Sequence, residues 1–378
     1  MATAQEQLDK NTRKSLRKNE DVGQLSQWTL IRRRFVRSRL SVIGLIVLII
    51  MYLMAIFADF IAPYAHDKLD SNSQFSNPTH IVFANGGFGT YGVKQVLDKV
   101  NYKYTYEIDP NTVYPIRLFV PSDEYKMWGF LPLRTRLFGL ETPPDVKQKL
   151  FLWGADRQGR DVFSRTLKGG QVSLSIGFIG VFISVVLATL IGTASGYFGG
   201  PIDNLIQRFI ELIQTFPFIS IFIAIAAALP PTMPVLQRYL LITIIFAFIN
   251  WTGLSREIRG KVLSYRASDY TNAAIAAGGS HWWVITRHMI PNALSHIIVV
   301  ASFAIPGAIA AETALSFLNL GILPPAVSWG VLLQDAQDIN SIRIYPWLLI
   351  PLGAIILASL CLYLLGDGLR DAVDPYST

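Results

Sequence analysis

The sequence has 378 residues, of which 51% are hydrophobic and 16% are charged. Ordinary soluble domains carry roughly 25% charged residues, so this chain lacks the polar surface to cover two or three soluble bodies. Its 22 Phe, 15 Tyr and 8 Trp exclude an intrinsically disordered chain, and its single cysteine, Cys361, excludes an internal disulfide. The net charge of +7 fits a nucleic-acid partner, an anionic membrane surface or neither.

Six apolar stretches are long enough, or nearly so, to cross a bilayer, which takes about 20 residues. A soluble core can hide one or two such helices but not six. The sequence therefore predicts an all-α polytopic membrane protein with six transmembrane helices. The long basic leader before the first stretch predicts a retained anchor rather than a cleaved signal peptide. The stretches are 40–58, 169–202, 212–229, 239–254, 294–311 and 346–366.

Lys and Arg in the connecting segments predict the orientation, because short cytoplasmic loops carry an excess of them. The first 39 residues hold ten Lys and Arg against four Asp and Glu. We therefore expect both termini in the cytoplasm, and we attribute the net charge to membrane orientation rather than to nucleic acid. The predicted division is a basic segment (1–39), the first helix (40–62), an external insert with an elbow (63–168), a five-helix core (169–366) and a tail (367–378).

The external insert between the first two helices is predicted to be a small, non-catalytic α+β unit. Residues 102–108 and 113–120 alternate apolar and polar side chains as strands do, and residues 93–100 have helical spacing. Residues 87–92 read GFGTYG, a literal G-x-G-x-x-G. A dinucleotide site needs a parallel sheet with covering helices, and the insert has no room for one, so we interpret this motif as a Gly-rich loop.

Charged residues just before the second helix form a dense polar elbow. Asp156 and Arg160, and also Asp161 and Arg165, have the i, i+4 spacing of ion pairs on one helix. We expect an external amphipathic helix that positions the second span.

Two features inside the predicted spans are candidates for a pathway or gate. Phe216 and Pro217 lie within the third span, where proline kinks a helix and makes either a hinge or a fixed bend. Glu312 lies at the outer end of the fifth span and is a candidate for lining a pathway. An interfacial carboxylate that reaches water is the favoured interpretation of Glu312.

The loop 255–292 is predicted to form a cytoplasmic helix pair. Residues 269–277 can form a short helix, Gly278 and Gly279 break it, Ser280 caps a second helix, and Pro291 ends that stretch. The small residues within it would let another protein approach closely. By periodicity alone, an amphipathic surface helix with no partner is the favoured interpretation.

This loop resembles the E-A-A-x-x-x-G-x₉-I-x-L-P loop of permease subunits from bacterial ABC importers. Ala273, Ala274, Gly278 and Pro291 match, Asn272 replaces the glutamate, and His288 stands at the isoleucine position. Other stretches resemble the C-type permease of the dipeptide/oligopeptide/nickel family. They are RRRFVRSRLSVIGL, ADFIAPYA, GADRQGRDVFSR, GYFGGPID, AETALSFLNLGILPPAVSWG and GDGLRDAVDP.

The resemblance implies a type I ABC importer permease in the bacterial cytoplasmic (inner) membrane. It implies that the loop is a coupling helix, and that the partners are a second homologous permease, two ATPase subunits and an extracytoplasmic solute-binding protein. The chain has no G-x-x-x-x-G-K-[ST] motif, catalytic motif or metal-ligand cluster. We expect no cofactor on this chain, with ATP and Mg²⁺ held by the partner subunits.

Peptides, either dipeptides or oligopeptides, are the favoured solute. Oligosaccharides and nickel chelates remain as alternatives within the family. A membrane sensor or scaffold with a ligand-binding insert is the alternative from another class, and a membrane-bound dinucleotide oxidoreductase would depend on GFGTYG alone.

Overall fold

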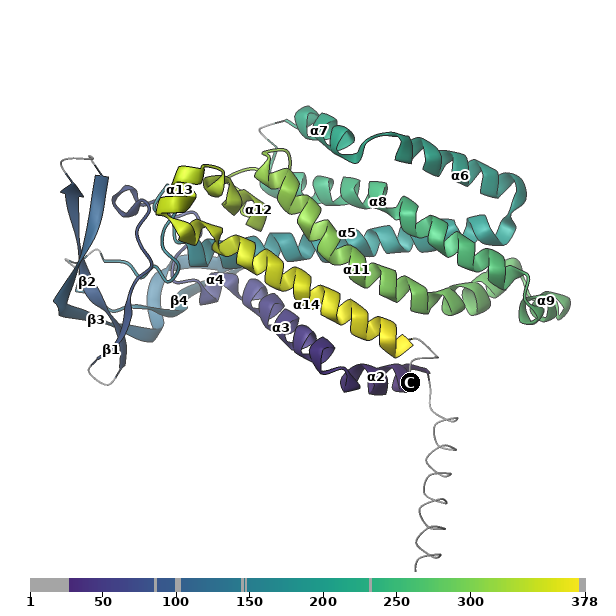
Figure 1. The fold of residues 1–378 in the computed structure, drawn as a ribbon, viewed down its shortest axis with the longest axis horizontal. Coiled ribbons are helices and arrows are strands. Elements are labelled where there is room, and N and C mark those ends of the chain that lie inside the picture. Colours follow the sequence, from purple (N-terminus) through teal and green to yellow (C-terminus); the bar gives the residue numbers. More distant parts are fainter. Residues whose placement is uncertain are drawn as a thin grey trace, which may run out of the picture.

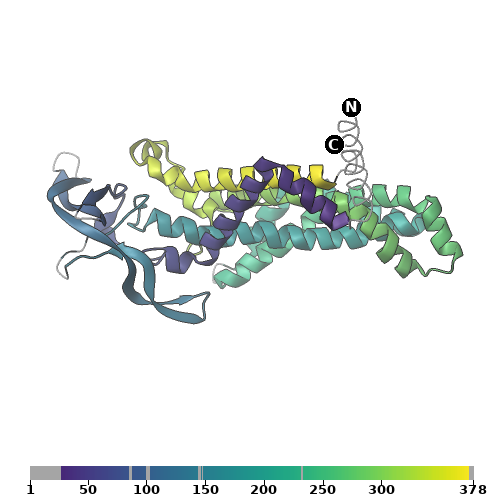
Figure 2. The same cartoon turned by 90° about the horizontal axis from the view of Figure 1, so that it is seen from below.

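The computed structural model describes residues 27–373, except 85–86, 99–102, 144–145, 147 and 231–232. Long helices form a bundle, and a four-stranded antiparallel sheet projects from one end of it (Figure 1). Helices α2 (Gln27–Arg37) and α9 (Asp269–Ala276) lie toward the opposite end. The same separation of sheet and α9 is clear after a quarter turn (Figure 2).

The elements follow one another in an order that places all strands between the first and second long helices. The strands are β1 (Ile81–Ala84), β2 (Gly87–Asp98), β3 (Lys103–Met127) and β4 (Leu131–Leu140). The remaining helices are α3 (Arg39–Ile56), α4 (Ala58–Ile61), α5 (Val162–Phe198), α6 (Gly200–Thr215), α7 (Phe218–Ala228), α8 (Val235–Arg266), α10 (His281–Val284), α11 (Ile290–Phe317), α12 (Trp329–Leu332), α13 (Ile339–Ile344) and α14 (Ile350–Val373). Short 3₁₀ turns cover Ser71–Ser73, Leu333–Ala336 and Pro346–Leu349, and a π-helical turn covers Ile285–Met289.

Five helices in the described part of the chain are long and apolar enough to cross a membrane. They are Arg39–Ile56, Val162–Phe198, Gln237–Arg266, His281–Phe317 and Pro346–Val373. These helices overlap five of the six predicted spans. The third predicted span, 212–229, is not one long helix, because the chain there is divided between α6 and α7.

The break between α6 and α7 replaces the predicted kink. Phe216 and Pro217 both have extended backbone, with ψ of 132° and 123°. Proline disfavours helical backbone in the residue before it and has no N–H to donate to the preceding turn. Helix α6 therefore ends at Thr215, and Pro217 becomes the N-cap of α7.

The core of the bundle lies around α5 and α11. Toward the sheet, Leu48, Leu174, Ile309 and Ile355 from four different helices bury their side chains together. Toward α9, a second cluster gathers side chains of α5, α6, α8, α10 and the π-helical turn with those of α11. Its buried members are Ala188, Tyr197, Ile210, Trp251, Leu254, Ile258, Val262, Val284, Ile285, Met289, Ala293 and Ile297.

The insert is a sheet in the described residues, so its predicted α+β character is wrong. The strand order is β1-β2-β3-β4, and the long β3 pairs with β2 in its first half and with β4 in its second. Residues 93–98, predicted as helix, belong to β2, where Val93 pairs with Ile108 and Val96 with Thr105. The helical spacing of their apolar side chains is outweighed by hairpin pairing with β3, to which the strand preference of valine contributes. GFGTYG also lies in β2, so its interpretation as a Gly-rich loop is wrong. The antiparallel sheet around it nevertheless supports rejecting a dinucleotide site.

The polar elbow is a loop rather than the predicted amphipathic helix. Asp156 and Arg160 do pair, with 2.8 Å between Oδ2 and Nε. The second predicted pair is wrong, because Arg165 pairs with Asp156 instead. Asp161 is the N-cap of α5 and accepts a 2.8 Å hydrogen bond from the Ser164 N–H. The helix thus begins at Val162, directly after the charged turn.

Arg136 joins the sheet to the end of the first span. From β4 its Nη1 donates hydrogen bonds to the carbonyl oxygens of Asp59, at 3.1 Å, and Ala62, at 2.8 Å. These carbonyls belong to the C-terminal end of α4, where helix oxygens lack intrahelical partners. The Asp59 carboxylate pairs with Lys168 of α5 at 2.8 Å. Arg136 therefore fastens the sheet to α4, and α4 is in turn paired with α5.

Candidate functional site

The segment from α9 to α10 projects from the bundle at the end away from the sheet (Figure 1). Its turn confirms three predictions. Helix α9 covers Asp269–Ala276, Gly278 breaks it at a φ of +85°, and the Ser280 Oγ accepts a hydrogen bond from the Trp283 N–H at 3.3 Å. The left-handed backbone at Gly278 is a conformation that residues with a Cβ rarely adopt.

Pro291 does not end the second helix, contrary to the prediction. The chain runs helically from His281 to Phe317 with a π-helical turn, Ile285–Met289, directly before the proline. A π turn shifts the hydrogen-bond register and so accommodates a residue without an N–H. The Asn292 side chain also donates to the His288 carbonyl at 2.8 Å.

The predicted interaction residues divide between the outer face and the base of the projection. Asn272, Ala273 and Gly278 are exposed, whereas Ala274 packs partly against the buried cluster beneath. Exposed apolar side chains of Tyr270, Ile275, Trp282 and Trp283 surround the small residues. Exposed apolar groups at this density are typical of a protein contact.

His288 and Pro291 lie closer to the bundle than α9 does. The His288 ring is half-buried, with its centroid 5.0 Å from that of Trp283 and 5.9 Å from that of Tyr270. Its Nε2 atom is buried without a hydrogen-bond partner among the described residues. Pro291 is exposed at the start of α11. His288 therefore supports the projection from below, whereas Asn272 and Ala273 form its surface.

Hydrogen bonds fix the base of the projection to the bundle. The buried Thr271 hydroxyl donates to the Tyr265 carbonyl at 2.8 Å, and the Tyr265 hydroxyl donates to the Asn292 carbonyl at 3.3 Å. Tyr197 of α5 and His281 of α10 share a 2.9 Å hydrogen bond. With the buried cluster between them, these contacts make α9 and α10 a rigid extension of α5, α8 and α11.

Close packing of α5 against α8 continues this rigidity along the bundle. A Cβ on Gly192 would lie 2.5 Å from the Ser255 carbonyl oxygen, and one on Gly196 would lie 2.8 Å from the Arg259 carbonyl oxygen. Backbone atoms cannot move aside as a flexible side chain can. The two glycines thus bring the helices to a separation that other residues would increase.

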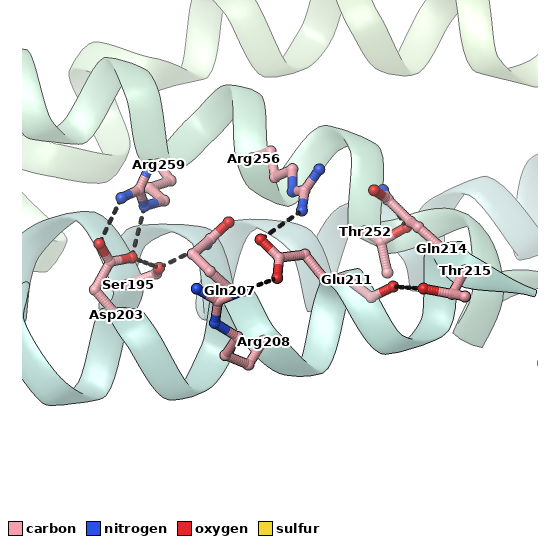
Figure 3. A network of polar contacts seen from close by, with 10 residues as sticks. All are labelled: Ser195, Asp203, Gln207, Arg208, Glu211, Gln214, Thr215, Thr252, Arg256 and Arg259. Atoms are coloured by element: carbon pink, nitrogen blue, oxygen red, sulfur yellow. Dashed lines mark hydrogen bonds and ion pairs between the residues drawn. The ribbon is translucent and has the colours of Figure 1, made fainter.

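A polar network that the sequence did not predict joins α6 to α8 (Figure 3). The Arg259 guanidinium donates to both carboxylate oxygens of Asp203, at 2.6 Å and 2.5 Å. The Ser195 hydroxyl of α5 donates to Asp203 at 2.5 Å and accepts from Gln207 at 3.0 Å. The one sequence signal was the placement of Asp203 within GYFGGPID, after the turn at Gly199.

The network continues along α6 toward the break before α7. Glu211 pairs with Arg208 at 2.7 Å and with Arg256 of α8 at 3.8 Å, and Gln214 donates to Thr252 at 3.2 Å (Figure 3). Helix α6 contacts the bundle through these polar groups and through the buried Ile210, and it leaves other large apolar side chains exposed. The exposed set is Ile202, Leu205, Phe209, Leu212 and, in the break, Phe216.

Glu312 is enclosed within the chain rather than open to water as expected. Its side chain is 3% exposed, and it accepts hydrogen bonds from Ser173 of α5 at 3.1 Å and Ser316 of α11 at 2.7 Å. The Ser173 hydroxyl in turn accepts from the Trp329 N–H at 3.1 Å. The carboxylate therefore ties α5, α11 and α12 together.

Comparison with known proteins places this architecture among transport proteins. Residues 177–376 match the family model of the binding-protein-dependent transport system inner membrane component, and residues 26–78 match the N-terminal TM domain of oligopeptide transport permease C. The chain is 42% identical over 224 residues to the oligopeptide transport system permease protein OppC of Haemophilus influenzae, which covers 59% of this chain and 70% of that protein. It is 29% identical over 351 residues to OppC of Escherichia coli, covering 93% and 91%. It is 37% identical over 226 residues to the dipeptide transport system permease protein DppC of Lactococcus lactis, covering 60% and 64%.

Proposed function

The chain belongs to the family of binding-protein-dependent transport inner membrane components, whose model matches more than half of it, and we propose that it imports peptides as one permease subunit of an ATP-driven transporter. The relatives named above are oligopeptide and dipeptide permeases, which favours peptides over oligosaccharides or nickel chelates. The chain is a membrane protein without a catalytic role of its own. ATP and Mg²⁺ are bound by partner ATPase subunits.

The observation that carries this proposal is the rigid projection formed by α9 and α10. Asn272 and Ala273 present a small, exposed surface among apolar side chains, and the base of the segment is hydrogen-bonded to three long helices. An ATPase subunit that bound this surface would not move α9 and α10 independently of the bundle. Its movement would be passed on to α5, α8 and α11.

The network around Asp203 extends the coupling to α6. Because Arg259 lies on α8, which leads directly to α9, a displacement of α9 also moves α6 through the ion pair with Asp203. The break at Phe216 and Pro217 then lets α7 reorient relative to α6. Phe216 and Pro217 would therefore act as the hinge of a gate. Glu312 has a structural role within the bundle, so we place it outside the pathway.

The exposed apolar face of α6 supports a second, homologous permease as partner. In lipid, helices associate through packing rather than through the hydrophobic effect, and aromatic side chains such as Phe209 provide large packing surfaces. We infer that α6 and α7 cross the membrane together as the third of six spans. The other permease would cover them, and the pathway would lie between the two subunits.

The ends of the bundle fit the orientation expected from the basic residues. The sheet and α9 lie at opposite ends (Figure 1), so a sheet outside the membrane requires α9 to be inside. We place α9 and both termini in the cytoplasm of a bacterium and the sheet on the side where a solute-binding protein delivers peptide. A sensor or scaffold role has no observation in its favour.

Replacing Ala273 with tryptophan tests the proposal. Ala273→Trp enlarges an exposed side chain on α9, and Ala273→Ser changes the same position without adding bulk. We expect Ala273→Trp to abolish ATP-driven peptide uptake and co-purification of the ATPase subunits, while Ala273→Ser keeps both. Normal uptake and normal co-purification by Ala273→Trp would contradict the coupling role.

A further inference from the structure

The hairpin between β3 and β4 turns beside the end of the first span. Its tip is Met127–Leu131 in the pairing of the two strands, with Trp128, Gly129 and Phe130 forming the turn. The Trp128 indole Nε1 donates a 2.8 Å hydrogen bond to the carbonyl oxygen of Ile56, the last residue of α3. The tip of the insert is therefore fixed at the depth where a membrane-spanning helix ends.

Large apolar side chains of the tip are exposed in spite of this anchoring. Trp128 is 46% exposed and Phe130 72% exposed. The ring centroid of Trp128 lies 5.8 Å from that of Phe57 and 5.9 Å from that of Phe130, so the three rings form a continuous row from the helix to the turn. Exposed aromatic rows on a soluble surface are unfavourable, whereas at the edge of a bilayer tryptophan is enriched.

The row continues the exposed apolar side of α3. Every turn of that helix leaves large aliphatic side chains uncovered, as expected of a surface that faces lipid. The last of them, Ile56, carries the carbonyl that binds Trp128. The uncovered set is Leu40, Ile43, Ile46, Ile49, Ile50, Leu53 and Ile56.

The backbone geometry of this turn does not favour tryptophan at position 128. Trp128 has a φ of +56°, a conformation that usually holds glycine or asparagine and is disfavoured for other residues. Gly129, at +81°, meets the ordinary preference. An aromatic residue in the disfavoured position indicates a stabilising contact outside the hairpin.

Beneath Trp128 the chain leaves an apolar groove of about 240 Å³ between α3 and α5. Its walls include Tyr52 and Ala55 of the first span and Gly170 and Leu174 of α5. The groove opens at the depth of the spanning helices, where a soluble binding protein does not reach. An acyl chain matches both its apolar walls and its position.

We propose that the β3–β4 tip lies in the lipid interface of the membrane, with Trp128 and Phe130 at headgroup level and a phospholipid acyl chain in the groove beneath Trp128. Tryptophan suits this position because its ring is apolar and its N–H is satisfied by the Ile56 carbonyl. The neighbouring Lys126 is exposed and can reach lipid phosphates from the same level. The outer leaflet follows from the orientation proposed above, whereas contact with lipid does not depend on peptide transport.

Fluorescence quenching by spin-labelled lipid tests the site. In the assembled transporter, Cys361→Ala removes the native thiol, and Phe130→Cys carries an environment-sensitive fluorophore. Phe83→Cys is the matched control, because Phe83 is 71% exposed on β1, at the opposite edge of the sheet. The complexes are placed in phosphatidylethanolamine and phosphatidylglycerol nanodiscs containing lipid with a doxyl group near the headgroup or near the end of the tail.

We expect a loss of fluorescence at position 130 that is larger for the shallow doxyl group, and no loss at position 83. An equal loss of fluorescence at positions 130 and 83 with both doxyl lipids would overturn the proposal. An unquenched probe at position 130, together with a cross-link to a subunit from a photoreactive amino acid at the same position, would assign the tip to a protein contact and would also overturn the proposal. Peptide uptake by the same complexes reports the transport function separately.

Discussion

The Asp203 carboxylate receives two hydrogen bonds from the Arg259 guanidinium, at 2.6 Å to Nε and 2.5 Å to Nη2. This bidentate pair connects the first turn of α6 to the half of α8 that leads to α9, and Ser195 of α5 shares the same carboxylate. Three helices that the membrane would hold only loosely are thereby joined at one point. The pair lies between the projection at α9 and the broken helix α6–α7, where a transmitted movement would have to pass.

Arg259→Gln removes the bidentate pair and leaves the Asp203 carboxylate with one partner fewer. Hydrogen bonds to charged groups contribute about 1.5–3 kcal/mol, and we expect a loss of stability in this range, measured as a lower midpoint in a thermal scan of the purified transporter. Uptake per bound ATPase should also fall. Arg208→Gln is the control, since Arg208 is 81% exposed in its pair with Glu211 and such pairs contribute little. Equal effects of both substitutions would contradict the role of Asp203.

Gly192→Ala tests the close approach of α5 and α8. The added Cβ would lie 2.5 Å from the Ser255 carbonyl oxygen, so the helices must separate, and overpacking of this kind costs roughly 1–3 kcal/mol. Gly253→Ala is the matched control, because no atom lies within 4 Å of its added Cβ. We expect a lower thermal midpoint for Gly192→Ala and an unchanged or higher one for Gly253→Ala. The reverse order would show that the helices do not depend on this contact.

Arg136→Ala should detach the sheet from the first span. Its loss leaves the carbonyls of Asp59 and Ala62 without their donor, at a cost of about 1–3 kcal/mol for buried groups. Hydrogen exchange in α4 should accelerate, and protease should cut the insert faster. Arg134→Ala changes the same strand two residues away, where the side chain pairs with Glu124 in solvent, and should leave both rates unchanged.

The elbow should lose stability as the pH rises toward 6. Burial raises the pKa of Asp161 to about 6, so the folded state holds this proton more tightly than the unfolded chain. The contribution of the group is complete below its unfolded pKa, about 3.9, and is lost as the pH rises through about 6. Asp161→Asn keeps a capping oxygen and should remove the fall in thermal midpoint between these values.

Asp338→Asn serves as the control for the titration of Asp161. Asp338 also caps a helix, α13, but hydrogen bonds from Ser341 and Asn340 lower its pKa. Its contribution therefore has the opposite sign, and its replacement should leave the fall toward pH 6 in place. A fall that persists in Asp161→Asn would assign the titration to another group.

The apolar runs predicted most of the bundle because a span depends mainly on local composition. The cap at Ser280 and the turn at Gly278 were equally predictable, since each acts within a few residues. Pro217 and Pro291 show where such reasoning stops. Both prolines lack the N–H that a helical hydrogen bond needs, yet Pro217 divides a helix and Pro291 lies inside a continuous one. The π turn before Pro291 makes the difference, and its formation depends on packing that the local sequence does not reveal.

Long-range pairing explains what the sequence could not predict. The Val93 segment has helical spacing, but hairpin pairing with β3 makes it a strand. Arg259 lies in the predicted loop 255–292, and only the fold brings it to Asp203. Glu312 lies near the end of a span in sequence, but α12 folds over it and buries it.

Site-specific cross-linking at position 272 tests the central claim that α9 is the surface for the ATPase. A photoreactive amino acid replaces exposed Asn272 in the assembled transporter, and the same amino acid at Phe83 in the sheet is the control. Irradiation should join position 272 to an ATPase subunit and leave position 83 without that product. Cross-links from position 272 to the binding protein, or from position 83 to the ATPase, would contradict the account.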